Sequence, residues 1–357
     1  MGVVKLGDVA RESRLKWTKS KQDVPIVGLE HLIPDEIRFD AYDINTDNTF
    51  SKRFVKGQVL FGRRRAYQRK AAIAEFDGIC SGDITVIEAI EGKIVSELLP
   101  FIIQTPVFFD YANRGSAGSL SPRVKWEHLV DYEFELPSLE EQKVLADKLW
   151  AAYRLKEAYK KLLVATDEMV KSQFIEMFGN SPQKELGELA TFVNGSAFKP
   201  EEWSQEGLPI VRIQNLTQGD APYNYYSGDT SKKVCLNTGD ILVSWSATLG
   251  VFTWSKGPAL LNQHIFKVVF DKLDIEQSFF IYTVKLALEK MADKAHGSTM
   301  RHVVKKDFDS TKVSFPSMRE QQRFVSIAEQ ADKSKFDDFK SQIYRDVWES
   351  SFFKSEE

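Results

Sequence analysis

The strongest constraint on the fold of this chain is that its sequence repeats itself once along its length. Four short motifs of the first half return in the same order in the second half, at an offset that stays near 180 residues. The first copies begin at Leu6, Gly57, Gly118 and Leu136, and the second copies begin at Leu186, Gly239, Gly297 and Phe315. Because both order and spacing are kept, we interpret the repeat as an internal duplication.

Each half follows one plan. Short apolar runs such as 71–74, 84–87 and 210–213 are separated by Gly, Asp and Asn, which is typical of strands joined by turns. A long helical pattern then takes over. The prediction is an α+β fold with two tandem mixed α/β domains, each followed by a long helix. The expected segments are domain 1 at 1–137, helix 1 at 138–180, domain 2 at 181–316 and helix 2 at 317–357.

The two helix starts carry the same signal. Ser138 precedes Glu141 by three residues, and Ser317 precedes Glu320 by three, so both form capping boxes. Apolar residues then recur at nearly heptad spacing, and a helix of about 40 residues would run roughly 60 Å. We expect such a helix to need a partner, and the nearest is the other helix of the same chain. The alternative is that each helix packs only on its own domain.

Composition limits the class of protein. The 357 residues carry a formal net charge of −3, so a nucleic-acid surface would have to be local. We find no run of eighteen apolar residues and no signal peptide, which favours a cytoplasmic protein without a membrane span. Cys80 and Cys235 lie in apolar runs and are expected to be buried free thiols. The Cys and His spacing predicts no metal site.

The densest basic segment is 62–70, which has five cations and no acid. It lies between two strand-like runs, so we expect a hairpin loop that offers its charges to solvent. Five like charges repel one another without a counter-anion, which favours an anion site over a solvated turn, and Arg, Gln and Tyr suit contacts with bases and phosphates. The candidate DNA-binding residues here are Arg63, Arg64, Arg65, Tyr67, Gln68, Arg69 and Lys70.

The equivalent places in the second half differ in chemistry. The loop that corresponds to 62–70 carries hydroxyl groups and an aromatic ring: Ser244, Trp245, Ser246 and Thr248. A second candidate group follows a strand-like run: Asn262, Gln263 and His264. A third group consists of basic residues that recur in both halves, as phosphate clamps would require: Arg123, Lys125, Arg301, His302 and Lys305. For His264 a structural role is equally compatible with the sequence, and for the lysines so is simple solvation.

At this point the motifs resemble those of the specificity subunits of type I restriction-modification enzymes. The resemblance rests on Leu-Gly-(Asp/Glu)-(Val/Leu)-Ala at 6–10 and 186–190, Gly-(Gln/Asp)-(Val/Ile)-Leu at 57–60 and 239–242, and Pro-Ser-(Leu/Met)-x-Glu-Gln at 137–142 and 316–321. It implies two target recognition domains and two helical regions that pair as an antiparallel coiled coil with pseudo-twofold symmetry. It also implies a bipartite double-stranded DNA target, two adenine methyltransferase subunits docked on the helices and motor-nuclease subunits as further partners. The resemblance implies no catalytic centre and no cofactor.

Two other classes remain open on the sequence. A stand-alone endonuclease would need clustered carboxylates near a lysine, and Asp35 with Glu91 and Lys93 fits that requirement only superficially, because the second half has no counterpart. The other class is a non-DNA scaffold whose domains bind protein. Salt dependence distinguishes it, because DNA binding through several phosphates weakens by orders of magnitude between about 50 and 200 mM salt.

Overall fold

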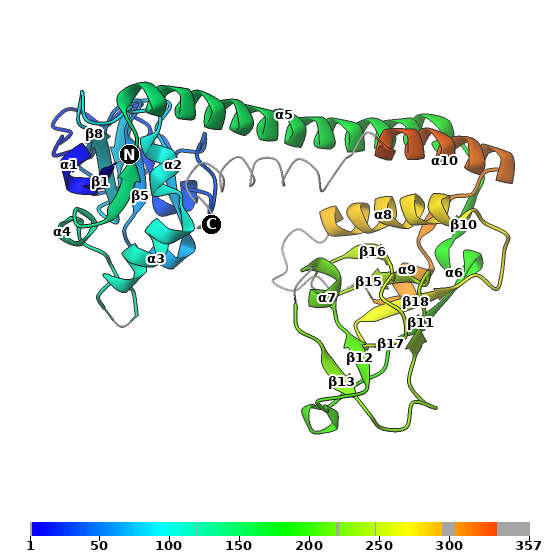
Figure 1. Cartoon of the computed structure of the whole chain (residues 1–357). Coiled ribbons are helices and arrows are strands. Elements are labelled where there is room, and N and C mark those ends of the chain that lie inside the picture. Colours follow the sequence, from blue (N-terminus) through cyan, green and yellow to red (C-terminus); the bar gives the residue numbers. More distant parts are fainter. Residues whose placement is uncertain (1, 119, 219–220, 247, 295–303, 334–357) are drawn as a thin grey trace. The chain divides into compact units, whose positions relative to one another are not determined.

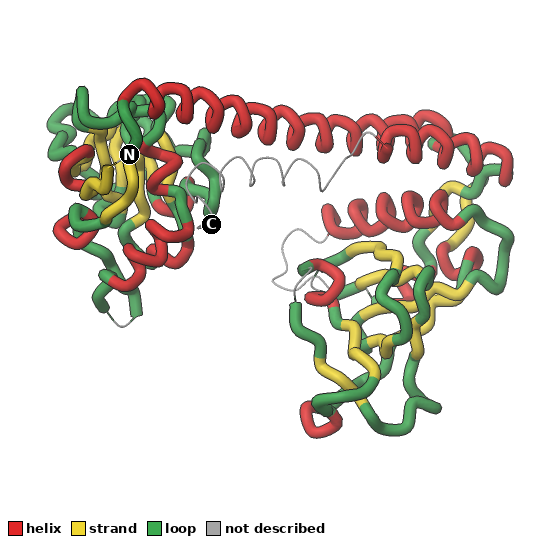
Figure 2. Tube along the Cα trace, viewed as in Figure 1, coloured by secondary structure: helices red, strands yellow, loops and turns green. Residues whose placement is uncertain are grey.

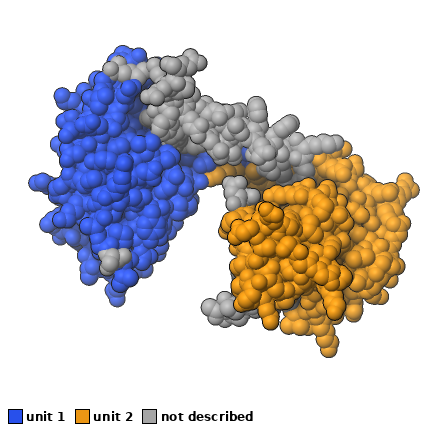
Figure 3. Space-filling view, turned by 60° about the horizontal axis from the view of Figure 1, so that its bottom comes forward, with its two compact units in different colours: residues 1–159, 337–357 blue, residues 160–336 orange. Residues whose placement is uncertain are grey.

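In the computed structural model of this chain, residues 2–118, 120–218, 221–246, 248–294 and 304–333 are described. The described residues divide into two compact units, one within residues 1–159 and one within residues 160–333, which Figure 3 distinguishes by colour. We call residues 2–136 the first head and residues 183–314 the second head. Among the described residues, no helix is both long enough and apolar enough to cross a membrane.

The first head is built on two small sheets and a terminal ribbon (Figure 1). The larger sheet has the order β2 (Ala10–Glu12), β8 (Ile84–Ala89), β5 (Val59–Gly62), β6 (Ala71–Ile73). The smaller sheet has the order β3 (Ile26–Val27), β7 (Gly78–Cys80), β4 (Lys52–Phe54), and the ribbon pairs β1 (Gly2–Lys5) with β9 (Glu133–Leu136). The helices are α1 (Leu6–Val9), α2 (Leu99–Ile103), α3 (Pro106–Arg114) and α4 (Trp126–Leu129), with the short 3-10 turns η1 (Leu29–His31) and η2 (Ala66–Gln68).

The second head has the same arrangement. Its larger sheet has the order β11 (Thr191–Asn194), β18 (Ile265–Val269), β15 (Ile241–Ser244), β16 (Gly250–Thr253). The smaller sheet has the order β13 (Asn224–Tyr226), β12 (Leu208–Val211), β17 (Ala259–Leu261), β14 (Cys235–Leu236), and the ribbon pairs β10 (Gln183–Glu185) with β19 (Lys312–Ser314). The helices are α6 (Leu186–Leu189), α7 (Ile213–Thr217), α8 (Gln277–Lys294) and α9 (Lys305–Asp309), with the 3-10 turn η3 (Pro200–Glu202).

The topologies confirm the duplication predicted from the sequence. Both larger sheets are antiparallel and keep the same strand order. In both smaller sheets the central strand, β7 or β17, has one parallel and one antiparallel neighbour. Figure 2 shows that each head combines short strands with helices and long connecting loops. The mixed α/β architecture with two repeated domains is therefore correct.

The repeated Gly-(Gln/Asp) motif closes the same turn twice. In the first head, the backbone N–H of Val55 donates to Oε1 of Gln58, and Nε2 of Gln58 donates to Glu88. In the second head, the backbone N–H of Asn237 donates to Oδ2 of Asp240, which also accepts from Lys267. The residue types differ, but each side chain holds the turn before the second strand of the sheet and ties it to the neighbouring strand.

The long first helix is observed as α5 (Leu139–Phe178), which has 40 residues. Its N-terminus has the predicted capping box, in which Ser138 Oγ and Ser138 N–H both donate to Glu141. The second helix, α10 (Met318–Lys333), begins with the same box at Ser317 and Glu320. Residues 334–357, on which the predicted pairing depends, lie outside the described residues, so the coiled coil stays a prediction.

The predicted apolar seam of α5 divides by exposure. Tyr159 and Thr166 are each 8% exposed, whereas Leu155, Leu162 and Met169 remain 49%, 50% and 53% exposed. The seam therefore does not form one continuously buried stripe.

The prediction that both cysteines are buried is half wrong. Cys80 is fully buried because it lies on β7, the central strand of its sheet, whereas Cys235 is exposed because β14 is an edge strand. An apolar run of residues does not distinguish a central strand from an edge strand, which is why the sequence did not separate the two thiols.

Candidate nucleic-acid interface

The basic segment 62–70 forms a tight loop after β5. The backbone N–H of Gly62 donates to the carbonyl of Lys70, which closes the loop, and η2 occupies its centre. Arg65 and Arg69, on either side of η2, both have a φ of 54°, so the chain turns sharply twice at non-glycine residues. Tyr67 at the tip is 57% exposed. The other candidate side chains of this loop are half-buried, so its charges are only partly offered to solvent.

The fold brings segment 121–125 to this loop. The N–H of Arg65 donates to the carbonyl of Pro122, the N–H of Val124 donates to the carbonyl of Arg63, and Arg64 forms a β-bridge with Arg123. Two candidate groups that are about 60 residues apart in the sequence are therefore one cluster in space. Lys125, at the N-cap of α4, lies at its margin and is exposed.

Internal carboxylates neutralise part of this cluster. Asp83 lies 2.7 Å from Nε of Arg123 and 3.3 Å from Nη1 of Arg64, and Asp35 lies 2.8 Å from Nε of Arg69. Partial burial by itself raises the pKa of Asp83, but Arg123 and Arg64 together outweigh it, so the pKa lies below its ordinary value. Segment 62–70 therefore does not lack counter-anions, contrary to the expectation, because Asp83 and Asp35 supply two from elsewhere in the sequence.

The cluster nevertheless keeps an excess of positive charge. Among the described residues, Arg63, Arg65 and Lys125 have no ion pair. Arg63 and Lys125 line a hollow of about 400 Å³ together with Glu12 and Glu127, and Nε of Arg63 is buried without a hydrogen-bond partner in the described part of the chain. These cations are the ones that remain available for phosphate or base contacts.

Lys70 and Gln68, two other candidates in segment 62–70, differ in their side-chain hydrogen bonds to the rest of the protein. Lys70 Nζ donates to the carbonyl of Leu29 at 2.7 Å, so it holds the loop against η1. Gln68 is partly exposed beside Tyr67 and has no side-chain hydrogen bond among the described residues. The amide of Gln68 is therefore better placed than Lys70 to contact an external ligand.

The corresponding loop of the second head is more enclosed than expected. Ser244 is fully buried and its hydroxyl donates to the carbonyl of Thr248, and Ser246 is 5% exposed. Direct base contacts by Ser244 and Ser246 do not fit this burial, and the Ser244 hydroxyl stabilises the loop from inside. Thr248 is exposed and stays a candidate.

An aromatic cluster forms the outer part of this loop. The Trp245 ring stacks on Phe266 with a centroid distance of 5.7 Å and lies 5.6 Å from the His264 ring. Lys305 Nζ lies 5.7 Å from the Phe266 centroid and 2.5 Å from a carboxylate oxygen of Asp309. Trp245 and His264 are partly exposed, and Nδ1 of His264 has no hydrogen-bond partner among the described residues.

The other candidates of the second head are less uniform. Gln263 is exposed, and Asn262 is half-buried beside a close crossing of the chain, where a Cβ at Gly195 would come within 2.0 Å of the Asn262 carbonyl. Arg301 and His302 lie outside the described residues. The structure thus brings Trp245, His264 and Lys305 together and leaves Gln263 at their edge through its contact with His264.

Two cation–aromatic pairs of the second head were missed by the sequence analysis. Lys233 Nζ lies 4.4 Å from the Phe198 centroid, and the Arg212 guanidinium lies 5.6 Å from the Trp203 centroid. Their partners are separated by tens of residues or by irregular loops, so no local motif marked them.

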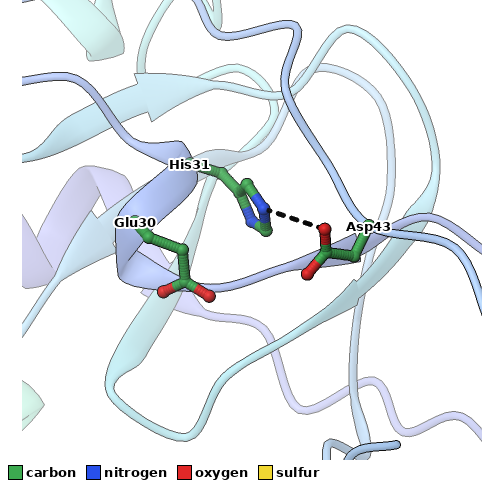
Figure 4. Close-up of side chains that lie close together, drawn as sticks. All are labelled: Glu30, His31 and Asp43. Atoms are coloured by element: carbon green, nitrogen blue, oxygen red, sulfur yellow. Dashed lines mark ion pairs between the residues drawn. The ribbon is translucent and has the colours of Figure 1, made fainter. Parts of the chain in front are cut away.

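One group in the first head has the composition of a cation site. The ligand atoms of Glu30, His31 and Asp43 lie within 4.8 Å of one another, and His31 Nε2 is 3.7 Å from Asp43 Oδ1 (Figure 4). However, His31 Nδ1 accepts a hydrogen bond from the Gly28 N–H at 2.9 Å. In neutral histidine the other nitrogen, Nε2, then carries the proton and has no lone pair for a metal. These residues therefore do not fit a metal centre.

The duplication explains His31 instead. In the second head, Asn215 occupies the equivalent place after β12, and its Oδ1 accepts from the Arg212 N–H. Each side chain closes the first turn after the strand that pairs in parallel with the central strand of the smaller sheet, β3 in the first head and β12 in the second. His31 is thus a capping residue.

The residues named for the endonuclease alternative do not form a cluster. Asp35 is paired with Arg69 and has a φ of 60°, so its carboxylate helps to hold the basic loop. Among the described residues, neither Asp35 nor Glu91 belongs to a group of three His, Cys, Asp or Glu side chains that could share an ion.

Comparison with known proteins agrees with this architecture. The family model described as "Type I restriction modification DNA specificity domain" matches residues 1–163 and 180–345. The chain is 26% identical over 156 residues to the type I restriction enzyme EcoBI specificity subunit of Escherichia coli, a match that covers 42% of this chain and 33% of that subunit. It is 20% identical over 341 residues to the putative type I restriction enzyme MjaX specificity subunit of Methanocaldococcus jannaschii, covering 86% of this chain and 80% of that one.

Two solved structures share the fold. The type I restriction-modification S subunit from M. genitalium has a TM-score of 0.56 at 12% identity, covering 99% of this chain and 96% of that chain. A chain from a structure described as the "structural basis underlying complex assembly and conformational transition of the type I R-M system" has a TM-score of 0.52 at 17% identity, covering 98% and 97%. Because the two family-model matches span both heads, the chain belongs to the type I restriction-modification DNA specificity domain family.

Proposed function

We propose that this protein is the non-catalytic specificity subunit of a type I restriction-modification complex and that its two heads read the two halves of a bipartite DNA target. The observation that carries the proposal is that one scaffold presents two chemically different loops at the same place. The loop after β5 is rich in arginine, whereas the loop after β15 presents Trp245 and a neighbouring histidine. Two readers of different sequences require such a difference.

The first head contributes cations through Arg63, Arg65 and Lys125, whereas Arg123 is held by Asp83 at 2.7 Å. Arginine pairs with guanine edges and with phosphates, and Gln68 suits adenine. Residues Arg64 and Arg69 are already paired with carboxylates, so their role in this proposal is to shape the loop. In the second head, Trp245, His264, Thr248, Asn262, Gln263 and Lys305 supply aromatic, amide and cationic contacts.

In this proposal α5 and the C-terminal helical region, paired as an antiparallel coiled coil, set the gap between the half-sites. They also dock two adenine methyltransferase subunits, and motor-nuclease subunits complete the complex. The support is the length of α5, 40 residues or about 60 Å, together with the apolar side chains that it leaves exposed. A helix that exposes Leu155, Leu162 and Met169 at heptad spacing has surface for a protein partner.

The test is to co-express the chain with its methyltransferase subunit in a host that lacks adenine methylation and to map methylated adenines across the genome. We expect a two-part motif with a fixed gap. A contiguous motif would mean that only one head reads DNA. A stable complex without methylation would contradict sequence reading, and the absence of a complex would favour the scaffold class.

A second measurement tests whether the length of α5 sets the gap between the half-sites. Inserting four helix-forming residues after Val164, between the buried side chains of Tyr159 and Thr166, lengthens α5 by about 6 Å, or roughly two base pairs. The gap in the methylated motif should change while both half-sites stay the same. A change in half-site identity would contradict the proposal.

A further inference from the structure

The outer edge of the larger sheet is covered in the first head. The N–H of Ile73 on β6 donates to the carbonyl of Ile37 at 2.8 Å, and Arg38 forms a parallel β-bridge with Ile73. Ile37 is 1% exposed, so its side chain belongs to the core. We call residues 36–38 the edge segment. It acts as a short additional strand beside β6.

Side chains hold the edge segment in place. Nε2 of Gln104 donates to the carbonyls of Glu36 and Ala71, and the Arg38 guanidinium lies 4.8 Å from the Trp150 centroid. Lys156 on α5 lies 3.4 Å from Glu36. Ile37, with the charged residues Glu36 and Arg38 on either side of it in the sequence, is thus held against β6 by these side chains.

In the part of the second head that the structure describes, the same edge is open. β16 is equivalent to β6, because Thr253 pairs with Ile241 as Ile73 pairs with Val59. Alternate residues of an antiparallel edge strand point their backbone groups outward, and by this equivalence Val251 and Thr253 do so. Within the described ranges, no hydrogen bond from another segment reaches the outward groups of either residue.

The length of one connection accounts for the difference. Asp43 in the first head pairs with Ile26, as Asn224 in the second head pairs with Ile210. From the capping residue to that pair there are eleven residues (32–42) in the first head and eight (216–223) in the second. The first residues of the shorter connection belong to the end of α7. Fewer residues therefore remain that could extend along the edge of the larger sheet.

A groove of about 990 Å³ lies along this open edge. Its walls are apolar: Leu249, Val251 and Phe252 on the side of β16, and Ile281, Tyr282 and Leu288 on α8. Charged side chains also line it: Asp167, Lys285, Glu289 and Glu329. Alignment of the heads on Gln142 and Gln321 puts Glu329 in the place of Trp150. Alignment on the backbone partners of these glutamines, Val95 and Glu276, puts Lys285 in the place of Gln104. Glu289 is already paired with Lys171 at 2.6 Å, so we take Glu329 as the carboxylate that could face a cation in the groove.

We propose that the open edge of β16 binds an extended segment of a partner protein that carries an apolar side chain followed by a basic one. The backbone of the segment would pair with the outward groups at Thr253, as the edge segment pairs with Ile73. Its apolar side chain would enter the groove, and its cation would lie near Glu329, where the first head has Trp150 facing Arg38. This site is separate from the DNA-reading loops, and it does not depend on the proposed function.

The edge segment itself provides the probe. We would label a peptide of residues 33–41 carrying Asp35→Lys and Asp40→Lys and measure its binding to the full chain by fluorescence anisotropy. Saturable binding is expected. Thr253→Pro removes the outward N–H while the hydrogen bonds to β15 remain, and it should weaken binding about tenfold. Thr253→Val, which keeps the N–H, should leave binding unchanged.

Charge and sequence of the probe give a second criterion. The same peptide with Arg38→Glu should bind at least about fivefold more weakly, and Glu329→Gln in the protein should reduce that preference. No binding of the original peptide, or equal binding to the Thr253→Pro and Thr253→Val variants, would overturn the proposal.

Hydrogen–deuterium exchange of the full chain tests the open edge without a ligand. The Ile73 amide should be protected and the Thr253 amide should exchange rapidly, becoming slower when the peptide is added. A Thr253 amide that is already protected in the chain alone would mean that another segment of this protein covers the edge. That result would overturn the proposal. Neither outcome changes the pattern of adenine methylation, so this experiment and the test of the proposed function can fail independently.

Discussion

The two heads share the hydrogen bonds that hold their turns, but they differ in the chemistry of the loops between these turns. Gln142 and Gln321 show the constant part: each accepts from a backbone N–H, of Val95 or Glu276, and donates to the carbonyl of the preceding proline. The loops after β5 and β15 show the variable part. The first is stabilised by ion pairs and the second by buried hydroxyl groups and ring stacking. A constant frame therefore allows the loop chemistry to change without a change of fold.

The largest expected difference between the heads is in thiol reactivity. Burial raises the pKa of Cys80 to about 12, whereas Cys235 is exposed. Because only the thiolate reacts, labelling with a disulfide reagent at pH 8 should modify Cys235 on the order of a thousandfold faster than Cys80. Following labelling of Cys80→Ser and Cys235→Ser variants would assign the two rates. Comparable rates in the folded protein would mean that β7 is not a buried central strand.

Charge reversal tests whether the first head binds DNA through its unpaired cations. Changing Arg63, Arg65 and Lys125 together to Glu should weaken DNA binding by at least about a hundredfold, because three favourable phosphate or base contacts become repulsive. The methyltransferase complex should still form. The matched control changes the exposed residues Arg14, Lys16 and Lys19 to Glu, with the same change of net charge. Equal losses in both variants would show that total charge, not the loop, determines binding.

The buried glutamines test the constant frame. Gln142→Met and Gln321→Met each leave a backbone N–H and a carbonyl without partners, and each should reduce the free energy of unfolding of its own unit by about 2–4 kcal/mol. Gln322→Met is the control, because that side chain is exposed on the same helix. Urea unfolding would measure the three changes. A large loss in one unit alone would break the equivalence of the two heads.

The smallest expected effect concerns the capping residues. His31→Ala and Asn215→Ala should each cost about 1 kcal/mol, and His31→Asn should restore most of the loss, because Asn performs the same role in the second head. Thermal unfolding measures the difference. Added zinc should not raise the melting temperature. Stabilisation by zinc that disappears in His31→Asn would instead support a metal site at Glu30, His31 and Asp43.

Much of the fold could be predicted from the sequence because its signals are local. A capping box spans three residues, a helical pattern recurs every turn, and a duplication is visible as two copies of the same short motifs. The positions of α5 and α10 and the equivalence of the two heads followed from these signals. The type of chemistry in the loop at 62–70 was also visible, because its cations are consecutive.

The sequence by itself determined that two copies of one α/β frame are joined by a 40-residue helix and that their loops differ in charge. The tertiary structure decided which side chains remain available. Asp83 and Asp35 reach the arginines from other segments, Ser244 lies inside its loop, and Cys235 lies on an edge strand. It also decided that the edge of β6 is covered, whereas no segment of the described residues covers the edge of β16. The physical reason is that burial and ion pairing depend on which segments meet in space, whereas caps and periodicity depend on neighbours along the chain.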